Sequence, residues 1–206
     1  MSVSKDVPDI VIGRLPIYLR ALNHLLDEGQ EITASKELAR WLGMSSAQIR
    51  KDLSHFGEFG KQGMGYDVAH LRDQLRRILQ VDREWLAALV GAGDLGHAMA
   101  HYGGLEGKGF RIACVFDNNR QKIGRNLGRF MICDVATLAG QVEELGIQVG
   151  IVAVPAGAAQ GVVDLLVKSG IRAILNYAPI TVTVPPGVEV QYIDPVVHLQ
   201  HMTYYL

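Results

Sequence analysis

The residues of this chain with the most specific chemistry form a glycine-rich turn, Gly91-Ala-Gly-Asp-Leu-Gly96. The turn directly follows the apolar run Leu86–Val90 and opens a stretch whose pattern predicts a helix. In such a turn the first glycine permits a tight bend, and the second lets the backbone approach a pyrophosphate. The third glycine allows the helix to pack closely on a sheet, and the start of the helix faces the phosphate charge. We therefore expect a dinucleotide to contact Gly91, Ala92, Gly93, Asp94, Leu95 and Gly96.

A carboxylate stands where this kind of turn needs one. The run Arg111–Phe116 predicts a second strand, and Asp117 follows it about twenty residues beyond the last glycine of the turn. An aspartate there accepts hydrogen bonds from both ribose hydroxyls and repels a 2′-phosphate, which favours NADH and NAD⁺ over the phosphorylated cofactors. The alternative is a glycine turn that binds another nucleotide, such as coenzyme A, or binds nothing.

Two later loops are expected to border the nicotinamide half of the ligand. One follows the predicted strand Val149–Val154, and the other follows the predicted strand Ala173–Leu175. Ligands of open α/β sheets bind beyond the carboxyl ends of the strands, so both loops should converge on one crevice. The loop residues expected in the site are Val154, Pro155, Ala156, Asn176, Tyr177, Ala178 and Pro179.

The segment from Glu37 to Leu53 has the pattern of two helices joined by a tight turn. Gly43 stands where the turn needs a positive φ, and Ala39 is small where the helices must approach each other. Polar side chains on one face of the second helix are suited to base edges and phosphates. From this face we expect DNA contacts by Ser45, Ser46, Gln48, Arg50 and Lys51. The alternative is a helix pair with a solvated polar face that serves only for oligomerisation.

The glycines of the next segment, Phe59–Tyr66, predict a tight hairpin. Lys61 on this hairpin is placed to contact the DNA backbone or an adjacent minor groove. The helix pair and the hairpin together indicate a winged helix-turn-helix.

The elements that position these residues change in character along the chain. Helical spacing predicts helices over Leu15–Leu26, after an N-cap at Thr33, over Ser45–Phe56 and over Val68–Leu79. From Trp85 onward, apolar strands alternate with helical stretches that follow Gly93, Asp134 and Ala156, as in βαβ units on a parallel sheet. The expected fold class is α/β, with a winged helix-turn-helix domain over 1–80 and a Rossmann-like, doubly wound parallel sheet over 84–194.

Composition limits the classes of function. The formal net charge of the 206 residues is -1, so a DNA contact must come from a local basic face. Two cysteines are too few for a disulfide framework and fit a reducing cytoplasm. No apolar run approaches the length of a membrane span, so we expect no membrane partner.

Catalytic residues are not evident. A dehydrogenase needs a proton donor beside the nicotinamide and a substrate domain, and too little chain follows the predicted sheet to form one. The pairs His97/His101 and His198/His201 have no Cys, Asp or Glu cluster beside them in sequence, so we expect no metal site. A small NAD-dependent oxidoreductase is a third, weaker interpretation.

The residues singled out above resemble the redox-sensing transcriptional repressor family called Rex. The resemblance covers nearly the whole chain and combines two unrelated motifs with long literal runs. It rests on Arg14–Arg20, Ala47–Gly60, Gly63–Tyr66, Gly91–Gly96, Phe116-Asp117, Val154–Ala156, Ala159-Gln160 and Gly170–Pro179.

The resemblance implies a homodimer that binds a palindromic operator in double-stranded DNA and releases it when NADH rises relative to NAD⁺. It adds Ala47 and Gly63 to the expected DNA contacts, and it makes the C-terminal segment, 195–206, a helix that reaches into the partner subunit. Arg20, Tyr102 and Asp194 match family positions that exchange partners across the dimer as the state switches. The chain departs from the family pattern at Asp94, at Tyr177 and at His55.

Overall fold

The computed structural model describes residues 7–60 and 64–206, and the chain divides into two compact units, Met1–Arg83 and Glu84–Leu206. Two residues expected to contact DNA, Lys61 and Gly63, lie outside the described residues.

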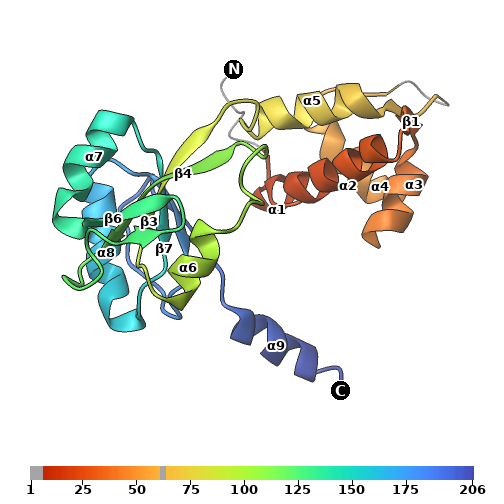
Figure 1. Cartoon of the computed structure of the whole chain (residues 1–206). Helices are drawn as coiled ribbons and strands as arrows, with labels where there is room; N and C mark the ends of the chain where they lie inside the picture. The colour runs from red at the N-terminus through yellow and green to blue at the C-terminus, as the bar shows by residue number, and fades with distance from the viewer. Residues whose placement is uncertain (1–6, 61–63) are drawn as a thin grey trace. The chain divides into compact units, whose positions relative to one another are not determined.

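The first unit is mainly helical. Its helices are α1 (Asp9–Ile12), α2 (Leu15–Asp27), α3 (Ser35–Leu42), α4 (Ser46–Ser54) and α5 (Val68–Ile78), shown in Figure 1. Apolar side chains spaced by three or four residues bury one face of each longer helix. The core they form includes Leu15, Leu22, Leu38, Ile49 and Leu71, each at most 1% exposed. Burying one leucine side chain contributes about 1.5–3 kcal/mol, so this face holds the helices together.

The turn between α3 and α4 has the geometry that the sequence predicts. Gly43 ends α3 with φ +65°, a left-handed conformation that glycine adopts without steric cost. Ser45 then caps α4, because its Oγ accepts a hydrogen bond from the backbone N–H of Gln48 at 3.1 Å.

The predicted N-cap at Thr33 is wrong. Thr33 belongs to a short strand, β1 (Ile32–Thr33), and α3 begins after Ala34, which makes no side-chain cap. The side chain of Thr33 is buried, and its hydroxyl donates to Glu37 Oε2 at 2.8 Å. Strand pairing keeps the backbone extended through Thr33, so the helix starts later than the side-chain chemistry suggested.

The strand at the end of the hairpin expected over 59–66 pairs with a distant segment of the chain. This strand, β2 (Tyr66–Asp67), pairs antiparallel with β1, more than thirty residues earlier, and not with the segment before the turn. Gly60 and Gly65 lie close together, since a Cβ added to Gly60 would lie 2.7 Å from the carbonyl oxygen of Gly65. The tip expected for the hairpin, 61–63, lies outside the described residues.

The second unit is built on a seven-stranded sheet in the order β5-β6-β4-β3-β7-β8-β9. Only β5 runs antiparallel to its neighbour, and the other pairings are parallel. The chain moves outward from β3 in one direction and returns to β7 on its other side, which places a topological switch point between β3 and β7. The strands are β3 (Trp85–Val90), β4 (Phe110–Asp117), β5 (Asn126–Leu127), β6 (Phe130–Asp134), β7 (Val149–Val152), β8 (Ala173–Asn176) and β9 (Glu189–Tyr192).

Helices cover both faces of this sheet (Figure 1). α7 (Leu138–Leu145) and α8 (Ala156–Lys168) bury apolar side chains against one face, and α6 (Asp94–Ala100) packs on the other. A 3₁₀ turn, Val135–Thr137, precedes α7. The central strand β3 serves both cores, because Ala88 and Val90 face α7 and α8 while Ala87 and Leu89 face the side of α6.

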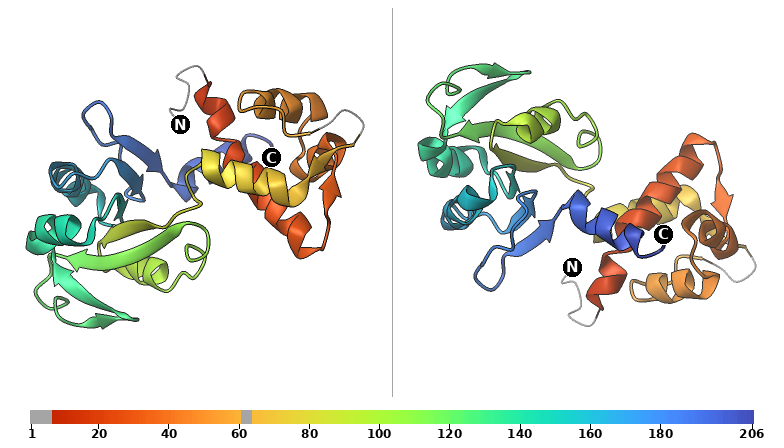
Figure 2. Two further views of the ribbon diagram at one scale, coloured as in Figure 1. Left: turned by 90° about the horizontal axis from the view of Figure 1, so that it is seen from above. Right: turned by 90° about the horizontal axis from the view of Figure 1, so that it is seen from below.

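The last helix, α9 (Pro195–Thr203), follows β9 (Figure 2). It buries none of its side chains. Its apolar residues are largely exposed, including Val197 at 58%, Leu199 at 58% and Met202 at 61%. Within the described part of the chain, no helix combines the length and the apolar character needed to cross a membrane.

Candidate functional site

A pocket of about 380 Å³ opens beside the glycine-rich turn, where β3, β4 and β7 end. The carboxyl ends of parallel strands meet here at the switch point, which is where open α/β sheets bind their ligands. The lining residues are Val90, Gly91, Gly93, Asp117, Asn118, Asn119, Lys122, Val135, Ala153, Val154, Pro155, Ala158 and Val162.

Two glycines of the turn have no room for a side chain. Gly91 has φ +107°, and a Cβ added there would lie 2.3 Å from the carbonyl oxygen of Ala153. A Cβ on Gly96 would lie 1.8 Å from the carbonyl oxygen of Gly91, so α6 can approach the turn this closely only through a glycine. At Gly93 an added Cβ meets nothing within 4 Å, so the open space beside this residue belongs to the pocket.

Asp117 ends β4 and is held against the turn. Its Oδ2 accepts from the backbone N–H of Ala92 and its Oδ1 from that of Asn119, both at 2.8 Å, while Lys122 Nζ lies 3.3 Å from Oδ2. Burial acts to raise the pKa of Asp117, but these donors outweigh it and hold the pKa below its ordinary value. Three donors leave about one free acceptor position on the carboxylate. Binding of both ribose hydroxyls therefore requires the longest contact, from half-exposed Lys122, to yield.

The residues expected at the two later loops separate into two groups. Val154 and Pro155 line the pocket, and Ala156 begins α8 directly after them. Asn176 is fully buried and is used internally: its Nδ2 donates to the carbonyls of Ala178 and Ile180, and its Oδ1 accepts from the N–H of Ala178. This side chain holds the loop in shape, and both its nitrogen and its oxygen are hydrogen-bonded within the loop. Tyr177, Ala178 and Pro179 follow on the same loop but are not among the residues that line the pocket.

Tyr177 keeps its hydroxyl protonated, because burial and the nearby Tyr102 raise its pKa. Of the turn residues, Ala92 is buried, while Asp94 and Leu95 are exposed in the first turn of α6.

More than half of the residues that line the pocket were not predicted from the sequence. Asn118, Asn119 and Lys122 lie just beyond Asp117 in sequence, and their proximity to that carboxylate could have identified them. Val135, Ala158 and Val162 are apolar residues of the 3₁₀ turn and of α8, and no local sequence signal distinguishes them from core residues.

Most of the residues of α4 that are expected to contact DNA are exposed to solvent. Ser45, Ala47, Arg50 and Lys51 are exposed, whereas Ser46 is partly buried. Arg50 Nη1 donates to Ser35 Oγ at 3.0 Å, a contact between α4 and the first residue of α3.

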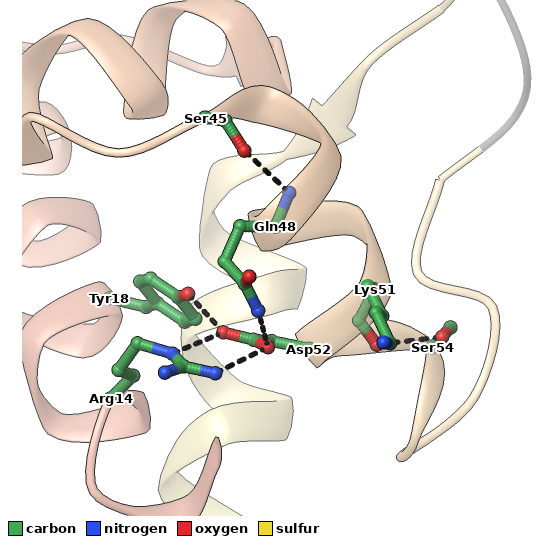
Figure 3. Close-up of polar contacts among 7 residues, drawn as sticks. All are labelled: Arg14, Tyr18, Ser45, Gln48, Lys51, Asp52 and Ser54. Carbon is green, nitrogen blue, oxygen red and sulfur yellow. Dashed lines mark hydrogen bonds and ion pairs between the residues drawn. The ribbon is translucent and has the colours of Figure 1, made fainter. Parts of the chain in front are cut away.

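Gln48 takes part in a buried polar cluster that the sequence did not predict (Figure 3). At its centre is Asp52 of α4, whose side chain is fully buried. Its Oδ2 accepts from Arg14 Nε at 2.6 Å and from the Tyr18 hydroxyl at 2.5 Å. Its Oδ1 accepts from Arg14 Nη2 at 2.8 Å and from Gln48 Nε2 at 2.7 Å. Burial acts to raise the pKa of Asp52, but the hydrogen bonds lower it below its ordinary value.

The remaining predicted positions lie in both units. Arg20 is exposed on α2, and Tyr102 is 56% exposed after α6. Asp194 caps α9, because its Oδ1 accepts from the N–H of Val196 at 2.9 Å. Among the described residues, no group of three or more His, Cys, Asp or Glu side chains is arranged to hold a metal ion.

A helix-turn-helix followed by a nucleotide-type pocket on a doubly wound sheet defines the class of ligand-responsive DNA-binding proteins. Two family models match the corresponding parts of the chain: "Putative DNA-binding protein N-terminus" over residues 6–54 and "CoA binding domain" over residues 82–180.

Relatives match over the whole chain. A redox-sensing transcriptional repressor Rex from Chloroflexus aggregans is 49% identical over 100% of this chain and 97% of its own. Rex 1 from Thermotoga maritima is 45% identical over 98% of this chain and 97% of its own. Among solved structures, RSP in complex with β-NAD⁺ and operator DNA superposes with a TM-score of 0.92 at 36% identity, covering 98% of this chain and 93% of that one. RSP in complex with β-NADH superposes with a TM-score of 0.88 at 34% identity, covering 98% of this chain and 95% of that one.

This chain belongs to the Rex family of redox-sensing transcriptional repressors. The predicted family, the predicted fold class and the prediction of a repressor in place of an enzyme are thereby confirmed.

Proposed function

We propose that this chain represses transcription by binding operator DNA through α4, and that NADH in the pocket beside Asp117 releases it. The observation that carries the proposal is the pocket itself. It combines a turn that borders the pocket through two glycines, Gly91 and Gly93, with a carboxylate at the end of β4, in a chain that also has a helix-turn-helix. RSP, which is similar over the full chain, has been solved with β-NAD⁺ and operator DNA and also with β-NADH.

The chemistry of the pocket favours the reduced cofactor. The nicotinamide ring is neutral in NADH and positively charged in NAD⁺. Val154 and Pro155 give the pocket apolar surface, and Ala156 follows them at the start of α8. Tyr177, on the neighbouring loop and outside the pocket lining, keeps a neutral hydroxyl. None of these four side chains carries a charge that could stabilise the oxidised ring. The effector shifts the balance between states only by its different affinity for each of them. A coupling of about 1–3 kcal/mol changes operator affinity roughly 5–150-fold.

Coenzyme A is the competing ligand, because the family model of the second unit carries that name. The adenosine ribose of coenzyme A bears a phosphate, and Asp117 would place a buried carboxylate against it. The repulsion favours an unphosphorylated ribose and hence NADH or NAD⁺.

We assign DNA binding to 1–80, dinucleotide binding to 84–194 and dimer contact to 195–206. The proposed DNA contacts are Ser45, Ser46, Ala47, Gln48, Arg50, Lys51, Lys61 and Gly63. The proposed cofactor contacts are Gly91, Ala92, Gly93, Asp94, Leu95, Gly96, Asp117, Val154, Pro155, Ala156, Tyr177, Ala178 and Pro179, to which the pocket adds Asn118, Asn119 and Lys122. Asn176, which the sequence placed among these contacts, is buried and supports them by holding its loop in shape.

A homodimer in the cytoplasm is part of the proposal. α9 exposes Val197, Leu199 and Met202, and such a helix is stable when a partner covers its apolar side chains. A palindromic operator then meets two copies of α4 in successive major grooves. Arg20, Tyr102 and Asp194 are the proposed residues that change partners between the two states. No metal takes part.

One titration tests the function. Fluorescence anisotropy on the operator duplex of the RSP complex is recorded with no effector, with NAD⁺ and with NADH. We expect binding without NADH and release with it. Binding that does not depend on the ratio of NADH to NAD⁺ would refute the sensing role. An Arg50→Ala variant should bind the operator more weakly, and unchanged affinity would remove Arg50 from the interface.

A further inference from the structure

The buried cluster around Asp52 connects α4 to the beginning of α2, and the proposed function does not account for it. Asp52 directly follows Arg50 and Lys51, two of the proposed DNA contacts, but its side chain points to the opposite side of the helix, into the unit (Figure 3). Arg14 is the N-cap residue of α2, and Tyr18 lies in its first turn. The two donors are 38 and 34 residues away from Asp52 in sequence.

The carboxylate is saturated with donors. It accepts four hydrogen bonds, two on each oxygen, which is about the full capacity of a carboxylate. The two bonds from Arg14 form a bidentate pair, whose planar geometry fixes orientation as well as distance. These bonds limit both the rotation of α4 about its axis and its sliding along α2. The exposed positions of α4 are thereby held in one orientation.

Gln48 lies one turn before Asp52 on the same side of α4 and links the cluster to the N-terminus of the helix. Its backbone N–H is bound by Ser45 Oγ, and its side-chain Nε2 donates to Asp52 Oδ1. With Nε2 held by the carboxylate, the amide has one orientation, and Oε1 remains as its free acceptor. The side chain is therefore pre-oriented before any DNA is bound, which reduces the entropy lost on binding.

Stability alone does not require such a cluster. A protein often remains equally stable or becomes more stable when a buried ion pair is replaced by apolar side chains of similar volume. The ion pair, however, restricts the relative geometry of its partners in a way that apolar contacts do not. We propose that Asp52 is a positioning residue for operator readout, which orients Gln48 and fixes α4 on α2. This inference rests on the proposed DNA-binding function.

Three variants test it, each measured on the RSP operator duplex and on a random duplex of the same length and base composition. Asp52→Asn removes the charge, and the double variant Arg14→Met/Asp52→Leu replaces the ion pair by apolar side chains. Glu37→Gln is the matched control. Glu37 is a carboxylate of the same unit whose Oε2 accepts from Gln30 and Thr33, both at 2.8 Å, and no hydrogen bond joins it to α4.

We expect both cluster variants to bind the operator about 10- to 100-fold more weakly, the range of one or two lost base contacts, and to bind the random duplex within about twofold of the wild type. The slope of log affinity against log salt should not change, because the phosphate contacts remain. Glu37→Gln should retain the wild-type ratio of operator to random affinity. Circular dichroism and melting curves establish that each variant is folded at the temperature of the assay.

The outcomes separate the two ideas. A folded double variant with the wild-type affinity ratio would show that the cluster serves stability alone and would overturn the inference. If the double variant does not fold, Asp52→Asn decides in the same way below its own melting temperature. A wild-type chain without preference for the operator would instead refute the proposed DNA-binding function.

Discussion

Replacing Gly96 with alanine should weaken NADH binding and make operator binding insensitive to NADH. The added Cβ would lie 1.8 Å from the carbonyl oxygen of Gly91, while contacts of a Cβ below 3.0 Å are essentially not seen. The turn and α6 must therefore separate by about 1.2 Å or more. The backbone N–H of Gly91 donates a hydrogen bond to the carbonyl oxygen of Phe116, and that of Ala92 donates to Asp117 Oδ2. The movement therefore also strains these two hydrogen bonds, which hold the turn to β4. Overpacking of this kind costs about 1–3 kcal/mol of stability.

The loss of cofactor affinity follows from the same displacement. Hydrogen bonds from the turn to a pyrophosphate are charge-assisted and contribute about 1.5–3 kcal/mol each. A shift of more than 1 Å breaks a bond whose donor and acceptor must lie within about 3.2 Å. Loss of two such bonds corresponds to roughly 100-fold or weaker NADH binding, since about 1.4 kcal/mol is a factor of ten. Operator affinity without NADH should stay near the wild-type value, so the variant should repress at any NADH concentration.

Isothermal titration with NADH measures the first effect, and operator anisotropy with and without NADH measures the second. Gly161→Ala is the matched control. Gly161 lies in the interior of α8, where an added Cβ meets nothing within 4 Å, so alanine should stabilise the chain by up to about 1 kcal/mol and leave NADH binding unchanged. A Gly96→Ala variant that binds NADH within threefold of the wild type would refute the assignment of this turn to the pyrophosphate.

Three further predictions concern other parts of the molecule. Asp117→Ala should reduce the preference for NADH over NADPH, measured by titration of both, and an unchanged preference would place cofactor selection elsewhere. The pKa values of Asp52 and Asp117 are lowered in the folded chain, so the stability they contribute is complete above the unfolded pKa of about 4 and is lost as the pH falls through the folded values. The urea midpoint of the wild type should accordingly decrease more on acidification than that of Arg14→Met/Asp52→Leu, and equal decreases would contradict the role of Asp52. Deletion of 195–206 should turn a dimer into a monomer in sedimentation experiments, and a truncated chain that remains dimeric would locate the interface elsewhere.

The main elements were predictable wherever periodicity and special residues coincide. The leucine spacing of α2, the left-handed Gly43 and the strand–turn–helix around Gly91 each place a local requirement at a defined residue. Three strands of the sheet, the edge strands β5 and β9 and the strand β6 beside β5, were not predicted. β5 has only two residues, β6 buries only Ile132, and β9 exposes most of its side chains, so none of them has the continuous apolar run of a central strand such as β3.

The site was predictable as far as its chemistry is local. The glycine turn and Asp117 could be predicted from their spacing in the sequence, because the turn follows the first strand of a βαβ unit and Asp117 ends the second. Asn176 looked like a ligand residue from its position after a strand, but its amide is fully used within its own loop. Asp52 gave no signal, because its partners Arg14 and Tyr18 are more than thirty residues away, and a charged residue on a polar helix normally faces solvent.

The exposed helix α9 has a consequence for how the chain folds. It contains nine residues and buries no side chain, and isolated helices shorter than about 12–15 residues are marginal in water. The N-cap at Asp194 lowers the cost of nucleation but supplies only about 1 kcal/mol. Helical order in this segment must then be completed by the surface that covers it, so the helix content of the chain should rise with protein concentration. A change that strengthens the association of two subunits should therefore increase the helix content of α9, and one that weakens the association should decrease it.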